Sequence, residues 1–332
     1  MSSKSVIPYF RVEGIKGILR DWNIPLDLYE PLKHYYNSTV NHLEILLDLF
    51  PDKPWDWHYL SMNPNITWEF VRRNPTMNWE WFGLSHNPNI TWEIIQNNPD
   101  EPWNWPGVSR NTNITCDVIQ SNPDKPWNWK HFSHNPNITW EIVQSKHEKL
   151  WDWSALSHKP NITWDIILAN PDKPWGWYFI SQNPNITWKI IQAHPVMYWE
   201  WYYLSKHSNV TWEIVLANPD RPWDWRGLSQ NLNITWDVVR RHLNKPWSFG
   251  YLSQNLNITW DVILDNPGAP WDWRGLSQNP NVTSEIVQRH PEKPWDWYGL
   301  SRNPNITWEM VYDNQDKPWD WYGLSCNKFS RK

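Results

Sequence analysis

The sequence contains only two cysteines, Cys116 and Cys326, among 332 residues, which is too few for a disulfide framework. It has no apolar run near the roughly 20 residues that cross a bilayer. Its first ten residues, MSSKSVIPYF, lack the apolar stretch of a secretion signal. Basic residues are not in excess either: 30 basic and 35 acidic residues give a net charge of −5, whereas nucleic-acid binding favours a basic surface. We therefore expect a soluble cytoplasmic protein that binds neither membranes nor nucleic acid.

Tryptophan, by contrast, occurs 33 times and follows a strict period of 24 residues. Three columns of Trp hold every copy except Trp22, and no insertion interrupts the period. The columns run from Trp55 to Trp319, from Trp57 to Trp321 and from Trp68 to Trp308, with Phe249, Cys116 and Ser284 in the three gaps. Because a repeat without insertions packs on each neighbour through the same surface, the sequence predicts one long solenoid.

Each unit has room for two short helices. The wording PWDWYGLS at 294–301 predicts the first helix, since Pro is tolerated in the first turn. The wording at 67–74 predicts the second, with Thr67 as its N-cap and Glu69 at its positive end. Helices of about two turns are not stable alone, so stacking must stabilise the array, and each buried Trp removes about 150–250 Å² from water.

Helical spacing assigns one side of each helix to the core. Trp57, Leu60 and Ser61 share one face of the first helix, and Trp68 and Val71 share one face of the second. Acidic residues beside the Trp columns are interpreted as solvated faces with weak ion pairs. The Asn-x-Thr sequence recurs in eleven units, and we interpret it as turn and capping chemistry and not as glycosylation.

The unit resembles the leucine-rich-variant repeat, which also has 24 residues. The likeness covers residues 55–326, with Trp at aliphatic and Pro positions, and rests on the wording LSxNPxxTxxExV, as at Leu84, Ser85, Asn87, Pro88, Glu93 and Ile95. It implies a right-handed solenoid in which α-helices alternate with α- or 3₁₀-helices, without catalytic residues. The Trp-rich wording is also similar to arrays of NPNITWE repeats in giant DNA viruses, which would place the protein in the host cytoplasm.

The predicted fold is therefore an all-α, right-handed α/α or α/3₁₀ solenoid of 24-residue, two-helix repeats. Its ends are expected to be atypical, because a terminal unit turns one face to water. The predicted divisions are a capping segment at 1–30, a degenerate first repeat at 31–54, a Trp-rich array at 55–326 with eleven full units and a final half unit, and a polar tail at 327–332.

No motif predicts an enzyme or a cofactor: the sequence has no Gly-rich phosphate loop, nucleophile elbow, HExxH or CxxC. His134 and His158 lie one unit apart, too far to share a zinc ion directly, and no metal site is expected. Three further histidines, His194, His242 and His290, occupy a position usually held by Asn and are interpreted as substitutes for it at a helix end.

The positions that vary between units predict the binding surface, since the packed positions hardly change. Two variable positions on the first helix form a ribbon rich in Tyr, Arg, His and Gln, and interfaces favour Tyr and Arg. The candidate residues are Tyr178, Tyr202, Arg226, Arg274, Tyr298, Tyr322, Arg110, His134, His158, Gln182 and Arg302. We predict a monomeric, non-enzymatic scaffold for a protein partner. Two alternatives are ordinary exposed surface and carbohydrate binding by exposed Trp and Tyr.

Overall fold

A computed structural model describes residues 41–329, and these hold 24 α-helices and no strand. The predicted all-α repeat architecture is confirmed, and every described helix is α and none 3₁₀. The predicted capping segment at 1–30, residues 31–40 and residues 330–332 lie outside the described residues. None of the helices between residues 41 and 329 has the length and apolar character needed to cross a bilayer.

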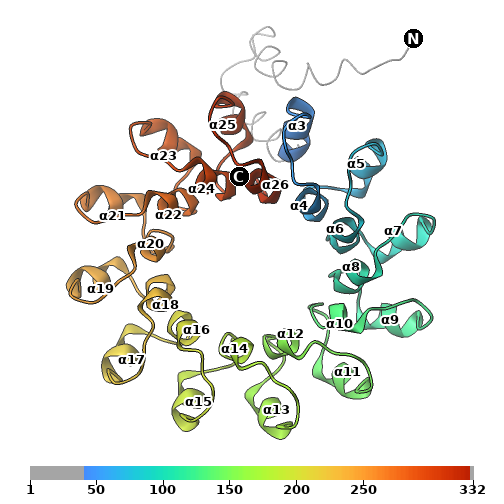
Figure 1. The fold of residues 1–332 in the computed structure, drawn as a ribbon, viewed down its shortest axis with the longest axis horizontal. Coiled ribbons are helices and arrows are strands. Elements are labelled where there is room, and N and C mark those ends of the chain that lie inside the picture. Colours follow the sequence, from blue (N-terminus) through green and yellow to red (C-terminus); the bar gives the residue numbers. More distant parts are fainter. Residues whose placement is uncertain (1–40, 330–332) are drawn as a thin grey trace, which may run out of the picture.

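The helices alternate between two circles around one centre (Figure 1). The inner circle consists of α4 (Trp57–Met62), α6 (Trp81–His86), α8 (Trp105–Arg110), α10 (Trp129–Phe132), α12 (Trp153–Ser157), α14 (Trp177–Ile180), α16 (Trp201–Lys206), α18 (Trp225–Gln230), α20 (Phe249–Leu252), α22 (Trp273–Gln278), α24 (Trp297–Arg302) and α26 (Trp321–Cys326). The outer circle consists of α3 (His42–Leu49), α5 (Trp68–Arg73), α7 (Trp92–Asn97), α9 (Cys116–Ser121), α11 (Trp140–Ser145), α13 (Trp164–Ala169), α15 (Trp188–Ala193), α17 (Trp212–Ala217), α19 (Trp236–Arg241), α21 (Trp260–Asp265), α23 (Ser284–Arg289) and α25 (Trp308–Asp313).

The solenoid closes into a ring. Figure 1 shows α3 and α4, near the start of the chain, beside α25 and α26 at its end, and these helices pair directly, α26 with α4 and α25 with α3. The last unit is composite, because its inner helix α26 comes from the C-terminal end and its outer helix α3 from the N-terminal end. The solvent-facing ends expected from the sequence are therefore absent from the described array.

The inner helices begin later than the sequence wording suggested. Each starts at the second Trp of its unit, or at Phe249 in α20, and the residue just before it is its N-cap. The Asp56 carboxylate, for example, accepts from the Tyr59 backbone N–H at 3.1 Å. The interpretation of this position as a solvated face with weak ion pairs missed this capping role, since the carboxylates satisfy open amides in the first turn, although Asp224 also forms an ion pair with Arg226. The prediction for the outer helices is confirmed, since Thr67 caps α5 with Glu69 in its first turn.

The core lies between the two circles. Leu60 on the inner helix, Ile66 in the turn and Val71 on the outer helix are buried, as are their equivalents in the other units. Most of the first Trp column is buried, and each of its indoles donates to a backbone carbonyl five residues earlier, as Trp127 does to Asn122 at 2.8 Å. Every Trp between residues 41 and 329 is buried or partly buried. The Trp columns therefore form the spine of the ring.

Polar ladders join each unit to the one before it. The Asn87 side-chain amide is fully buried and donates to the backbone carbonyls of Ser61 (2.9 Å), Asn63 (2.9 Å) and Ile66 (3.2 Å). The buried Ser61 hydroxyl accepts from the Glu80 backbone N–H at 2.9 Å. Sequence reasoning placed Ser61 on the core face, which burial confirms, but assigned the Asn position only to turns and helix ends, although its recurrence was a signal of burial. Each ladder satisfies backbone groups that burial would otherwise leave without a partner.

The asparagines of the Asn-x-Thr sequence also form hydrogen bonds between neighbouring units. The Asn113 side-chain amide donates to the carbonyls of Pro88 (2.7 Å) and Ile90 (3.1 Å) of the preceding unit. This amide nitrogen is the atom that a glycan would modify, and it is already engaged between units. The structural role assigned to the Asn-x-Thr wording is therefore supported, with inter-unit bonding added to turn chemistry.

Candidate functional site on the inner wall

The solvent-facing side of the even-numbered helices forms the inner wall of the ring. The opposite side of each is buried against the core, as at Leu60 and Ser61 in α4, so the remaining side turns towards the centre (Figure 1). A contact across two units supports this placement: the rings of Phe82 and His131 have centroids 6.2 Å apart. Side chains two units apart can meet only on the concave side of a curved array.

All predicted ribbon residues lie on the even-numbered helices or in the turn directly after them. The structure adds a third variable position, one residue after the first, which holds His131 and Tyr203 and is elsewhere often Gly. Sequence reasoning left this position out, although comparing the units shows that it varies too. None of the three wall positions holds an acidic residue in any of the twelve inner helices.

Glycine at the third position lets neighbouring inner helices approach closely. A Cβ on Gly107 would lie 2.6 Å from the Phe82 backbone oxygen and 2.9 Å from the Ser85 Cβ. A side chain there would force the two helices apart. Larger residues at this position occur both in four-residue helices, as His131 in α10 and Phe179 in α14, and in a six-residue helix, as Tyr203 in α16.

The wall divides into two sections of different chemistry. Helices α14 to α26 carry a Tyr/Arg section, in which two of the Arg side chains form ion pairs. The Arg302 guanidinium lies 3.7 Å from the Tyr298 ring centroid and forms an ion pair with Asp320. Arg226 pairs in the same way with Asp224, at 2.9 Å.

Helices α4 to α12 carry a histidine section, which holds His58, His86, Arg110, Lys130, His131, His134 and His158. Burial, followed by the charge of Arg110, lowers the pKa of His86, His131 and His134. The Nε2 atom of His134 lies 3.5 Å from the Asp152 carboxylate, which opposes part of this shift. The common effect of Arg110 on three imidazoles shows that the wall brings these groups together.

The histidines assigned to helix ends have the predicted position and a further contact. His194, His242 and His290 are the C-cap residues of α15, α19 and α23. Each ring also lies against a Trp of the preceding unit, as His194 does against Trp164 at 5.0 Å between centroids.

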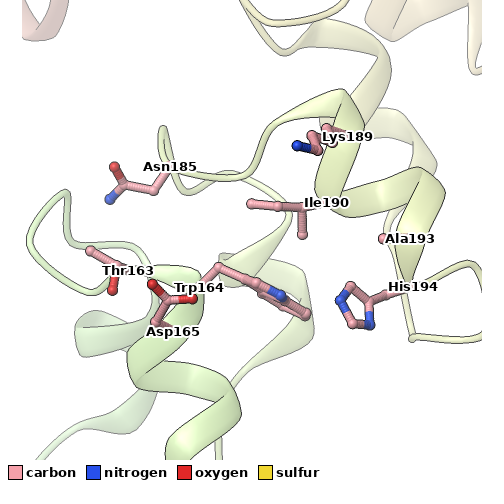
Figure 2. Close-up of a pocket in the computed structure, with 8 residues that line it drawn as sticks. All are labelled: Thr163, Trp164, Asp165, Asn185, Lys189, Ile190, Ala193 and His194. Carbon is pink, nitrogen blue, oxygen red and sulfur yellow. The ribbon is translucent and has the colours of Figure 1, made fainter.

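The outer face offers a shallow depression between α13 and α15. It has a volume of about 450 Å³ and is lined by Trp164, His194, Asp165 and Lys189, among others. Figure 2 shows the Trp164 indole facing the His194 ring across it. Because the Trp–His pair recurs at Trp212 and Trp260, we interpret this depression as a consequence of repeat packing.

Within residues 41–329 no group of three or more His, Cys, Asp or Glu side chains could hold a metal ion. Both cysteines are free thiols, and burial raises the pKa of each. Comparisons with protein-family models, with curated proteins and with solved structures found no match to this chain.

Proposed function

We propose that the protein is a non-enzymatic scaffold that binds a protein partner along its inner wall. The proposal rests on a difference in variability between the wall positions and the packed positions. Trp, Leu, Ser and Asn recur at the packed positions, whereas the wall positions differ from unit to unit and expose Tyr178, Arg226, Arg274, Tyr298 and Tyr322. A surface that varies on a constant frame can recognise a sequence of different groups, and Tyr and Arg are common at the energetic centres of interfaces.

The ring geometry supports an elongated partner. Successive inner helices present their wall residues side by side, so that a segment lying along the wall would contact several units in turn. Stacking also preorganises the wall, since Arg274 lies 4.8 Å from the Tyr298 ring centroid. Side chains held in this way lose less conformational entropy on binding than free ones do.

Carbohydrate binding, the second candidate, receives less support. Aromatic platforms for sugars must be accessible, and no Trp of the described residues is in the exposed class. Exposed tyrosines, namely Tyr178, Tyr298 and Tyr322 on the wall and Tyr198 outside it, could serve that purpose. A cytoplasmic location, including the host cytoplasm for a viral protein, is part of the same proposal.

The test is proximity cross-linking and affinity capture with the full chain at physiological salt. The matched variant replaces Tyr202, Arg226 and Tyr298 with Ala, while a control replaces three exposed residues of the outer face, Leu168, Leu216 and Leu264, with Ala. We expect partners that the wall variant loses and the outer-face variant retains. Recovery of the same proteins by both variants would contradict binding at the wall.

A further inference from the structure

The inner wall contains one section in which basic residues lie on helices with neutral N-caps. Eight of the twelve inner helices have Asp or Glu as their N-cap residue. Two of these carboxylates form ion pairs with wall cations, Asp224 with Arg226 and Asp320 with Arg302. The N-cap residues of helices α8 and α10 are neutral, Asn104 and Asn128. They are the only inner helices that combine a neutral N-cap with a Lys or Arg at the wall. We call Arg110, Lys130 and the adjacent His86, His131 and His134 the cationic section.

Arg110 is the residue at the centre of this section. Its Nε atom is buried and has no hydrogen-bond partner, and the described residues provide no carboxylate within ion-pair distance of its guanidinium. Arg302, at the equivalent position of α24, has one, and Arg274, which has none, lies over the Tyr298 ring instead. A guanidinium without a carboxylate is an incomplete pair, and planar oxyanions are the ligands that complete it with the best geometry.

His131 adds a donor that depends on protonation. Its Nδ1 atom lies 3.0 Å from the Asn128 side-chain oxygen, which can only accept. The neutral ring therefore carries its proton on Nδ1 and presents an acceptor at Nε2. Protonation converts Nε2 into a donor, which suits an anion and not a neutral ligand.

The charged groups around these imidazoles decide the direction of the effect. His131 faces Arg110, Lys130 and Asp152, and His134 faces Arg110, Asp152 and His131. Burial disfavours the imidazolium form most, Arg110 and Lys130 add to that effect, and Asp152 opposes it. A bound carboxylate reverses this balance, so binding is coupled to proton uptake.

We propose that the cationic section binds the carboxylates of an acidic, extended polypeptide segment, and that binding strengthens as the pH falls. This inference rests on the proposed function and names the chemistry of the partner. Charge complementarity favours this occupant, because none of the three wall positions holds an acidic residue. The overall net charge of −5 would oppose a polyanion elsewhere on the surface and so restricts it to this section.

The probe is a peptide of glutamates, titrated into the full-length protein by calorimetry at pH 6.0 and pH 8.0. We expect saturable binding that is about tenfold tighter at pH 6.0, and proton uptake measured in buffers of different ionisation enthalpy. A glutamine peptide of equal length tests the need for carboxylates. An oligothymidylate tests the competing occupant, and tighter binding of it than of the glutamate peptide would overturn the proposal.

The matched variants are Arg110→Gln and Arg302→Gln. Arg110→Gln should weaken peptide binding about tenfold or more, and Arg302→Gln should leave it unchanged, because Arg302 is already paired. His131→Gln is a second variant, which is needed if Arg110→Gln folds poorly. It should unfold like the wild type and should lose most of the pH dependence of peptide binding. Equal losses in the two Arg variants, or no saturable binding of the peptide, would overturn the site. The capture experiment with the Tyr202, Arg226 and Tyr298 variant tests the proposed function separately. If the peptide does not bind but that variant still loses a partner, this inference fails and the proposed function stands.

Discussion

The Asn63 side-chain amide donates to the Ser325 backbone carbonyl at 2.9 Å, although 262 residues separate them. The same amide donates to the Asn327 carbonyl, also at 2.9 Å. Inside the array, Asn87 makes the equivalent bonds to Ser61 and Asn63 with the same lengths. The first and last units of the described array therefore meet through the interface that joins the other units.

The rest of that interface is reproduced at the junction. The Ser325 hydroxyl accepts from the Asp56 N–H at 2.9 Å, as Ser61 accepts from Glu80. Trp55 meets Trp321 edge to face at 4.8 Å, and Lys53 lies over the same indole. Phe50 on the N-terminal side also contacts Trp321, with ring centroids 5.5 Å apart. The junction thus repeats the main contacts of the other interfaces without a covalent connection, and Phe50 stands where most other units have Asn or His.

The first prediction concerns this junction. Asn63→Leu removes its buried amide and leaves the Ser325 and Asn327 carbonyls without a partner, which costs about 2–4 kcal/mol. Because no peptide link spans the interface, we expect the ring to open, with a larger radius of gyration in small-angle scattering. The control is Asn111→Leu, which breaks the same bonds between covalently connected units. A scattering profile that is identical for the two variants would show that the ends are not held together in solution.

The second prediction concerns Lys159, which replaces the ladder Asn in its unit. Its buried ammonium donates to the Asn135 carbonyl at 2.5 Å, and burial lowers the pKa of Lys159 to about 8. The folded state therefore disfavours the charged form, and the contribution of this group to stability rises as the pH increases from about 8 to 10.5. Lys159→Asn restores the ladder and should stabilise the fold at pH 7 by about 1–2 kcal/mol.

Urea unfolding at pH 7.0 and pH 9.5 measures both effects. The advantage of Lys159→Asn should shrink at the higher pH, because the wild-type lysine then loses its charge. An advantage that is constant across this range would argue against desolvation as the cause. Lys189→Asn, at an exposed position on α15, is the control and should show no such trend.

The third prediction concerns glycine on the inner helices. Gly107→Ala places a methyl group 2.6 Å from the Phe82 carbonyl oxygen, and we expect a loss of about 1–3 kcal/mol as the two helices move apart. Gly268→Ala is the matched control, because nothing lies within 4 Å of its added Cβ. Thermal unfolding should separate the two variants. Equal melting temperatures would mean that the helices do not approach each other this closely.

The fourth prediction concerns the Trp columns. All 32 described indoles are buried or partly buried. The tryptophan fluorescence of the folded protein should therefore be blue-shifted, and acrylamide should quench it weakly. Unfolding in guanidinium should shift the emission to the red and restore quenching. Readily quenched emission from the folded protein would place the columns at the surface and revive the carbohydrate-binding alternative.

Sequence alone was sufficient where the chemistry is local. The 24-residue period determined the number of units, helical spacing identified Leu60 and Val71 as core, and Thr67 followed the rules for an N-cap. The variable positions led to the wall residues for the same reason, since constant packing leaves only the free side to vary. Local patterns also misplaced one group: Asp56 satisfies the first turn of its own helix, because that helix starts later than Pro54 suggested.

Closure, the buried ladders and the cationic section required the tertiary structure. Whether the array closes depends on the small rotation between successive units, which must total one full turn, and no residue pattern states that angle. Asn63 has the same sequence context as every other ladder Asn, yet its partners come from the opposite end of the chain. The ring also places Phe82 against His131 and Arg110 near three imidazoles, because only curvature brings side chains from separate units to one side.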